Sequence, residues 1–195
     1  MNNKVMLIGK LVKIVPNEKY AVIEIKRNSN QTDSIRVKYT NNIMDIAVLL
    51  NTSVKVEGTL YTFNTKHNIE NNGKCKTKLN IFVKGSIQIN NTPFDKYNEV
   101  KYTGYLVKQP ITRLTPLGRT ITDLMIVIND ENRKSYYIPV ITFGDLANAC
   151  SNYKIGDKLN LTGRIQSREY LKVINNEEIV KTAYEVAARV VFKEE

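Results

Sequence analysis

The chain has 195 residues, of which 42% are hydrophobic and 8% aromatic, and it carries a formal net charge of +10. That length allows one large domain or two small ones, and the basic excess favours a polyanionic partner, either nucleic acid or an anionic membrane. No apolar run approaches the roughly 18 residues that a membrane-spanning helix needs, and no basic amphipathic helix that would lie on a membrane surface is apparent.

Short runs of alternating polar and apolar residues dominate the first half of the chain. They predict strands at 4–15, 20–27, 35–39, 54–63 and 79–89. Between the third and fourth of these strands, Ile43, Ile46, Ala47 and Leu50 follow the spacing of one helix face, which predicts a short helix. The segment "NNTPFDKYN" that follows contains turn formers and a proline, and we expect a joint there.

The second half follows the same plan. Its patterns predict strands at about 100–108, 121–128, 136–143, 158–171 and 183–192. A short helix is expected after Gly144 and Asp145, between the third and fourth strands. The turn-rich stretch "QPITRLTPLGR" separates the first two strands, and "NDENRK" and "NNEE" mark later turns.

The two halves also repeat each other in sequence. "GKLVK" at 9–13 recurs as "GYLVK" at 104–108, and "SVKVEGTL" matches "DKLNLTGRI" when Gly58 is laid on Gly163. Five strands with one helix between the third and fourth is the order of an OB-fold. We therefore expect an all-β protein of two tandem OB-folds, each a five-stranded Greek-key barrel, at 1–90 and 99–195 with a linker at 91–98.

The stretch "GRIQSREYL" at 163–171 is the outward row of the fourth strand in the second half. Alternation places leucine, glycine and isoleucine side chains inside this barrel and the intervening side chains outside. The outward side chains that we regard as candidates for binding are Arg164, Gln166, Arg168 and Tyr170. Such a row is either the solvent-exposed face of an ordinary amphipathic strand or a surface that binds a ligand.

A similar row of cations and aromatic rings is expected on the first half. Its outward candidates are Arg36, Lys38, Tyr61 and Phe63, followed by lysines of the loop before the last strand, Lys66, Lys74, Lys76 and Lys78. Residues 1–97 carry a net charge of +8 and residues 98–195 a net charge of +2. The rings are open to two interpretations: cross-strand packing or a dimer interface, and a platform on which bases stack.

The second half resembles the bacterial single-stranded-DNA-binding protein family over about residues 99–192. The resemblance rests on the turn "PITRLTPLGR", on "FGDLA" at the start of the expected helix, and on "GRIQSREY". They match the family patterns P-x-x-R-x-T-P-x-G, F-G-x-L-A and E-G-x-[IL]-x-[ST]-R-x-[WY], with Thr162 replacing the acidic residue of the last. The second half looks in particular like the variant with two barrels per chain found in low-GC Gram-positive bacteria.

The resemblance implies roles for individual residues. Aromatic rings at the positions of Tyr137, Phe143 and Tyr170 stack on bases in this family, and tyrosine here replaces tryptophan at two of them. Arg113, which matches the arginine of the family turn, and Arg119, which follows that turn, complete the candidates of the second half. The family assembles four barrels, so we expect a homodimer. Because this chain stops at "VVFKEE", we do not expect recruitment of other proteins through the family's acidic tail.

Patterns typical of enzymes and cofactor sites are missing from the sequence. His67 is the one histidine, "GKL" at Gly9 lacks the rest of a phosphate-binding loop, and the acidic residues form no metal-binding cluster. The two cysteines, Cys75 and Cys150, lie far apart, and the first residues do not form a secretion signal. We expect a cytoplasmic protein that is not an enzyme and holds no metal or cofactor.

These observations together predict a protein that binds single-stranded DNA with little sequence preference. Cations would follow the phosphates and rings would stack on the bases, protecting exposed strand in replication, recombination or the transfer of plasmid or phage DNA. Three alternatives stay open: a single-stranded RNA binder, an adaptor of primosome or conjugation machinery that acts mainly through protein contacts, and a structural OB subunit without a ligand.

Overall fold

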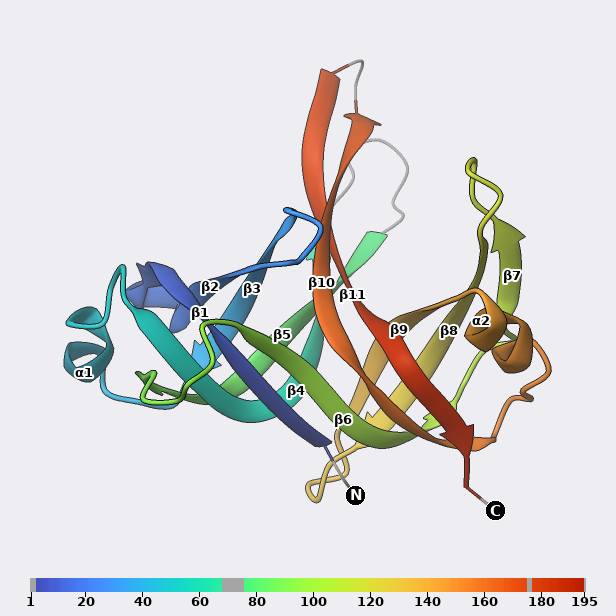
Figure 1. Cartoon of the computed structure of the whole chain (residues 1–195), viewed down its shortest axis with the longest axis horizontal. Helices are drawn as coiled ribbons and strands as arrows, with labels where there is room; N and C mark the ends of the chain where they lie inside the picture. Colours follow the sequence, from blue (N-terminus) through green and yellow to red (C-terminus); the bar gives the residue numbers. More distant parts are fainter. Residues whose placement is uncertain (1–2, 68–75, 175–176, 195) are drawn as a thin grey trace.

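The computed structural model of the chain describes residues 3–67, 76–174 and 177–194. The elements of its first half are β1 (Asn3–Val15), a 3-10 turn (Pro16–Glu18), β2 (Tyr20–Lys26), β3 (Thr32–Tyr39), α1 (Ile43–Ala47), β4 (Ser53–His67) and β5 (Lys76–Ile89). Strand β1 pairs with β2 and β4, β2 with β3, β3 with β5, and β5 with β4. The five strands therefore close into a barrel (Figure 1).

The second half repeats this cyclic order of pairing. Its elements are β6 (Tyr97–Leu106), β7 (Ile111–Leu114), β8 (Thr120–Asn129), β9 (Ser135–Phe143), α2 (Asp145–Cys150), β10 (Lys158–Ile174) and β11 (Glu177–Lys193). Strand β6 pairs with β8 and β10, β8 with β9, β9 with β11, and β11 with β10. The expected all-β class is confirmed, with short helices directly before β4 and β10, the fourth strands of the two cycles when β7 is left out.

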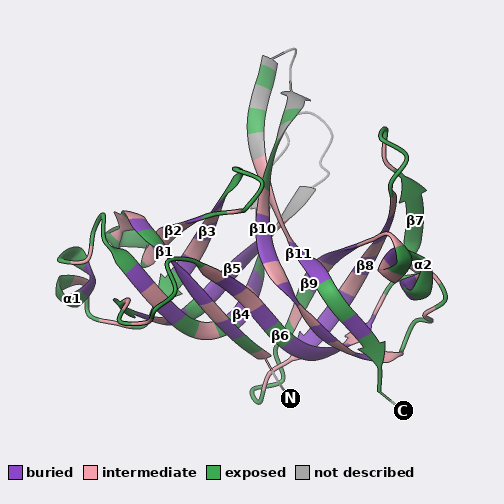
Figure 2. Ribbon diagram, in the orientation of Figure 1, coloured by how far each residue is buried: buried purple, intermediate pink, exposed green. Residues whose placement is uncertain are grey.

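Burial alternates along the strands as the sequence predicts. In β4, Val54, Val56 and Leu60 are buried, and in β10, Leu159 and Leu161 are buried. These side chains belong to one hydrophobic core that runs through both halves, and Figure 2 shows the buried residues as repeated bands along β4, β6 and β10. Successive side chains of a strand point to opposite faces, and only one face of these strands lies against the core, so burial alternates from residue to residue.

Gly58 and Gly163, the glycines that set the register of the repeat, are glycines for the same structural reason: the neighbouring strand leaves no room for a side chain. A Cβ atom at Gly163 would lie 2.6 Å from the backbone oxygen of Ala187 in the neighbouring strand, and one at Gly58 would collide with the backbone of Lys84. Because glycine has no Cβ, the fourth and fifth strands approach closely at these positions.

Strands β1 and β6 join the two halves. They pair antiparallel, with Val5 opposite Val100. These two valines are counterparts in the sequence repeat, and an antiparallel pair of equivalent residues implies a local twofold axis between the halves. The halves therefore lie side by side along these two strands in one 11-stranded sheet (Figure 1).

Two asparagines flank this junction in equivalent positions. The side-chain amide of Asn3 donates to the Leu60 carbonyl at 3.1 Å and accepts from the Leu60 backbone N–H at 3.0 Å. Asn98 makes the same pair of hydrogen bonds with Ile165, at 2.7 Å and 3.0 Å. Each asparagine side chain therefore takes the place of a strand partner for the backbone N–H and C=O of one residue in the neighbouring strand.

The structure departs from the expected elements at β7. Residues 109–119 read as a turn-rich loop, yet Ile111–Leu114 forms a strand that pairs with β8, with Arg113 opposite Ile121. Pro110, Pro116 and Gly118 mark the ends of this strand rather than a continuous loop. Strand β6 also begins earlier than expected, at Tyr97. Among the described residues, no helix has both the length and the apolar character needed to span a membrane.

Candidate nucleic-acid interface

Arg119 and Phe143 come together on the outer face of the second half. Phe143 ends β9 opposite Ile121 of β8 and packs against a small apolar cluster of Ile121, Ile141 and Ala187, separate from the main core. Arg119 lies in the turn before β8, and its guanidinium carbon lies 4.8 Å from the centre of the Phe143 ring. The ring thus has apolar support and a cation over it, which is a cation–π contact.

Arg113 lies close to this pair in the sheet. Its Nε donates to Asp123 Oδ2 at 2.9 Å, and both side chains are exposed. Exposed ion pairs of this kind stabilise a protein by only about 0–1 kcal/mol. Arg113 therefore loses little when it exchanges Asp123 for another anion. The structure brings together three of the predicted residues, Arg113, Arg119 and Phe143.

Tyr137 shares a face of β9 with Phe143 but lies at the other end of that strand. Its side chain is 45% exposed. Phe143 follows Tyr137 by six positions along the strand, which corresponds to about 20 Å. The neighbouring Tyr136 faces the other way and donates to Asp130 Oδ2 at 2.7 Å. Burial, followed by this hydrogen bond, raises the pKa of Tyr136 to about 12.

Three of the four predicted first-half residues form a single cluster. Tyr61 and Phe63 are neighbours on the outer face of β4, with ring centres 6.0 Å apart. Phe63 stacks on Phe82 with ring centres 5.1 Å apart, and Lys38 Nζ lies 5.9 Å from the centre of the Tyr61 ring. Tyr61 also contacts Tyr136 of the second half at 5.3 Å. Cross-strand aromatic packing therefore occurs here, while Phe63 keeps 38% of its surface exposed.

Arg36, the fourth predicted residue of the first half, lies among aromatic rings. Its guanidinium carbon is 5.7 Å from the centres of the Tyr20 and Phe82 rings and 5.6 Å from that of Tyr184 on β11. Because Tyr184 belongs to the second half, this half-buried arginine links the two halves. Sequence alternation identified its outward direction but not the rings that surround it.

Arg164 and Gln166 lie in the seam between the halves. Both point out of their own barrel as predicted, but Gln166 is only 8% exposed, which corrects its expected position on a wet face. Its amide nitrogen donates to Glu185 Oε1 at 2.6 Å, and its amide oxygen accepts from Arg164 Nη2 at 3.2 Å. Burial, and then the nearby charge of Arg27, lower the pKa of the Arg164 guanidinium.

Arg168 and Tyr170 lie in the later part of β10. Arg168 is exposed on β10 and has an interaction partner in the protein. The backbone of Tyr170 continues β10 opposite Lys181, while its side chain lies outside the described residues, as do Lys74 and the side chains of Lys66, Lys76 and Lys78.

A polar network that sequence reasoning missed also crosses the seam. Asp33 of β3 is fully buried, and Arg27 Nε donates to its Oδ2 at 2.7 Å while Arg27 Nη2 forms an ion pair with its Oδ1. The same Oδ1 accepts from the backbone N–H of Ser167 at 2.9 Å, and the Ser34 N–H donates to Ser167 Oγ at 3.0 Å. An aspartate at an inward-facing position of β3 was the available signal, since buried carboxylates require partners.

Comparison with known proteins gives this geometry a context. Residues 97–192 match the model of the single-strand binding protein family. The matched stretch runs from the start of β6 into β11 and so spans the second half of the chain. Within the described residues, no group of three or more histidine, cysteine, aspartate or glutamate side chains is arranged to hold a metal ion.

Solved structures resemble the whole chain in fold. The wild-type single-stranded DNA binding protein from Thermus aquaticus aligns with a TM-score of 0.68 and 20% identity, covering 99% of this chain and 93% of that one. A deletion mutant of the same protein aligns with a TM-score of 0.67 and 21% identity, covering 98% and 94%. A search of curated proteins found no match.

Proposed function

We propose that this chain binds single-stranded DNA with little sequence preference, through two tandem OB-folds. The observation that carries the proposal is the family match of residues 97–192, the region in which Arg113, Arg119 and Phe143 come together. Aromatic stacking and phosphate contacts are the two interactions that bind single strands without reading their sequence. The biological role would be to protect exposed strand in replication, recombination or the transfer of plasmid or phage DNA.

Several features support the interpretation of both halves as OB-folds. Both follow the same cyclic order of strand pairing, with the helix in the same place. The hydrogen bonds of Asn3 and Asn98 are equivalent. The fold of the Thermus aquaticus protein extends over nearly the whole chain.

The two halves would bind by different chemistry. The second half offers Phe143, supported by an apolar cluster, and the exposed ring of Tyr137. In the first half, Phe63 is partly exposed, whereas Tyr61 and Arg36 are engaged with residues of the second half. The first half has the larger net charge, so we propose that it contributes mainly attraction to phosphates.

A titration of fluorescently labelled oligo-dT at several salt concentrations tests the proposed function. We expect binding to weaken as salt rises, with a log–log slope of about −0.7 for each phosphate neutralised on a single strand. A matched oligo-U competitor determines whether RNA binds as well. Saturable binding with that slope supports the proposal. If the chain does not bind oligo-dT at low salt, or if its binding does not respond to salt, the proposal is wrong and an adaptor or structural role gains support.

We also propose that two chains associate as a homodimer, giving four barrels. Val190 and Phe192 on β11 are exposed apolar side chains that an interface would cover. Light scattering at micromolar concentration should then give twice the chain mass of 22.3 kDa. A stable mass of a single chain under these conditions would rule out the dimer, whether or not the protein binds oligo-dT.

A further inference from the structure

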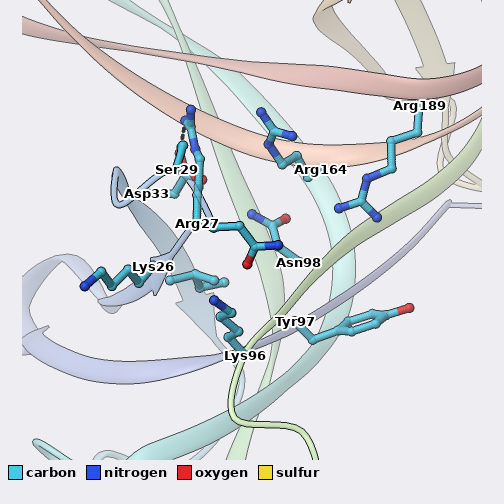
Figure 3. A pocket seen from close by; sticks show the side chains of 11 residues that line it. Lys26, Arg27, Ser29, Asp33, Lys96, Tyr97, Asn98, Arg164 and Arg189 are labelled. Carbon is cyan, nitrogen blue, oxygen red and sulfur yellow. Dashed lines mark hydrogen bonds and ion pairs between the residues drawn. The ribbon is translucent and has the colours of Figure 1, made fainter.

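A basic pocket of about 550 Å³ lies between the two halves of the molecule. The turn after β2, the start of β6 and the outer faces of β10 and β11 line it. Five cationic side chains reach its wall, while Asp33 is the one acidic residue of the lining (Figure 3). These cations are Lys26, Arg27, Lys96, Arg164 and Arg189.

The single carboxylate does not neutralise this pocket. Asp33 is fully buried and accepts hydrogen bonds from Arg27 and from the backbone of Ser167. Arg164 Nε is buried and has no hydrogen-bond partner. Within the part of the chain that the structure describes, no hydrogen bond or ion pair joins Arg189 to another residue. A buried guanidinium N–H without an acceptor is costly, so an anion whose oxygen accepts from Arg164 Nε would stabilise the folded protein.

The cations of this pocket also act on one another. Burial first, and then the charges of Arg27 and Arg189, lower the pKa of Arg164, while the charge of Asp33 acts in the opposite direction. Like charges that face one pocket destabilise the protein unless an anion separates them. Binding of an anion there relieves this repulsion.

A β-bulge places Arg189 in the pocket. Val190 pairs with Thr162 and Ala188 pairs with Gly163, which leaves Arg189 as the extra residue of β11. A bulge re-aims a side chain and is a specific feature of a sheet rather than a defect. The equivalent pairing of β4 with β5 in the first half runs without a shift of register.

The local twofold axis shows that this pocket is particular to one side of the molecule. With Gly58 laid on Gly163, the counterpart of Arg164 is Thr59, and Arg189 has no counterpart. The repeated fold alone therefore does not account for the pocket. Relative to the first half, the second half has Arg164 in place of a threonine and Arg189 as an extra residue, and both add a cation to the same pocket.

We propose that this pocket is a phosphate-binding site, in which Arg164 and Arg189 hold the phosphate oxygens and Lys96 adds charge, and that the phosphate belongs to the backbone of a bound strand. Guanidinium groups match phosphate geometry with two parallel hydrogen bonds. Arg168 lies on the same face of β10 as Arg164, about 13 Å away along the strand, so a nucleic-acid strand that follows β10 reaches the pocket. The identity of the phosphate rests on the proposed function, whereas the phosphate site itself does not.

The first experiment uses the protein alone with inorganic phosphate. At constant ionic strength, replacing chloride with phosphate should raise the Tm of the wild type, because a ligand that binds the folded state stabilises it. The double variant Arg164→Gln/Arg189→Gln should lose this rise. A control that removes two exposed charges outside the pocket, Lys10→Gln/Lys154→Gln, should keep it. The phosphate site is wrong if the wild type gains nothing from phosphate, or if the double variant gains as much as the wild type does.

The second experiment identifies the source of the phosphate. With oligo-dT, the log–log salt slope of the double variant should be less steep than that of the wild type by about 0.7 for each strand phosphate lost. The lysine control should keep a steeper slope than the double variant. An unchanged slope in the double variant, together with a lost response to inorganic phosphate, would overturn the strand as the source and leave free phosphate or a mononucleotide. If the wild type does not bind oligo-dT, the proposed function fails while the first experiment still decides the site.

Discussion

Replacing Asp33 with alanine is expected to lower the free energy of unfolding by about 3–5 kcal/mol, since it breaks a buried ion pair by removing one partner. Asp33 is fully buried, while the Arg27 side chain keeps 17% of its surface exposed. Water that reaches Arg27 softens the loss, so the lower end of the range is the better expectation. The change also removes the acceptor for the backbone N–H of Ser167.

Denaturant unfolding followed by circular dichroism measures this loss. Asp33→Asn removes the charge but keeps an acceptor oxygen, so its loss of stability should be smaller than that of alanine. Asp95→Ala, at an exposed position between the halves, is the matched control and should change stability by less than about 0.5 kcal/mol. Equal stability of Asp33→Ala and Asp95→Ala would show that the network does not stabilise the protein.

Most strands of the fold could be predicted from the sequence, whereas β7 could not. Strands were predictable because their alternation reflects burial in their own barrel, and the repeat of "GKLVK" as "GYLVK" doubled the evidence for each element. Strand β7 was not predicted, because the prolines and the glycine near it are typical of a loop. Its pairing with β8 provides the hydrogen bonds that the local sequence does not reveal.

The candidate site was only partly readable for a related reason. Alternation tells whether a side chain points out of its own barrel, and it was right for Arg36 and Gln166. It does not tell what faces the outer surface of the barrel. The pairing of β1 with β6 places the two halves against each other at Arg36 and Gln166. Gln166 is consequently buried, and Arg36 packs between rings of both halves.

Arg189 was invisible for a different reason. Its position depends on one extra residue in β11, and a bulge changes which face a side chain occupies without leaving a pattern in a single sequence. By contrast, Phe143 was found because the family resemblance supplied its role. The structure adds the apolar cluster beneath it and the Arg119 guanidinium over it.

Replacing Phe143 with alanine is expected to weaken oligo-dT binding by about 1–3 kcal/mol, roughly 5- to 150-fold in Kd, which is the range measured for loss of one stacked base. The ring is suited to stacking because Ile121, Ile141 and Ala187 hold it in place, so little side-chain freedom is lost on binding. In the structure, the Arg119 guanidinium lies over the ring. A base that stacks on this face would displace the guanidinium and free it to contact a phosphate of the strand.

Three companion variants separate stacking from packing. Phe143→Leu keeps apolar contact with the cluster but has no ring, so we expect near-normal stability and weakened binding. Phe143→Trp offers a larger aromatic surface and should bind at least as tightly as the wild type. Phe94→Ala removes an exposed ring near the joint between the halves and should leave affinity unchanged. If Phe143→Leu binds oligo-dT as tightly as the wild type, base stacking on this ring is excluded, and any loss in Phe143→Ala reflects the apolar cluster instead.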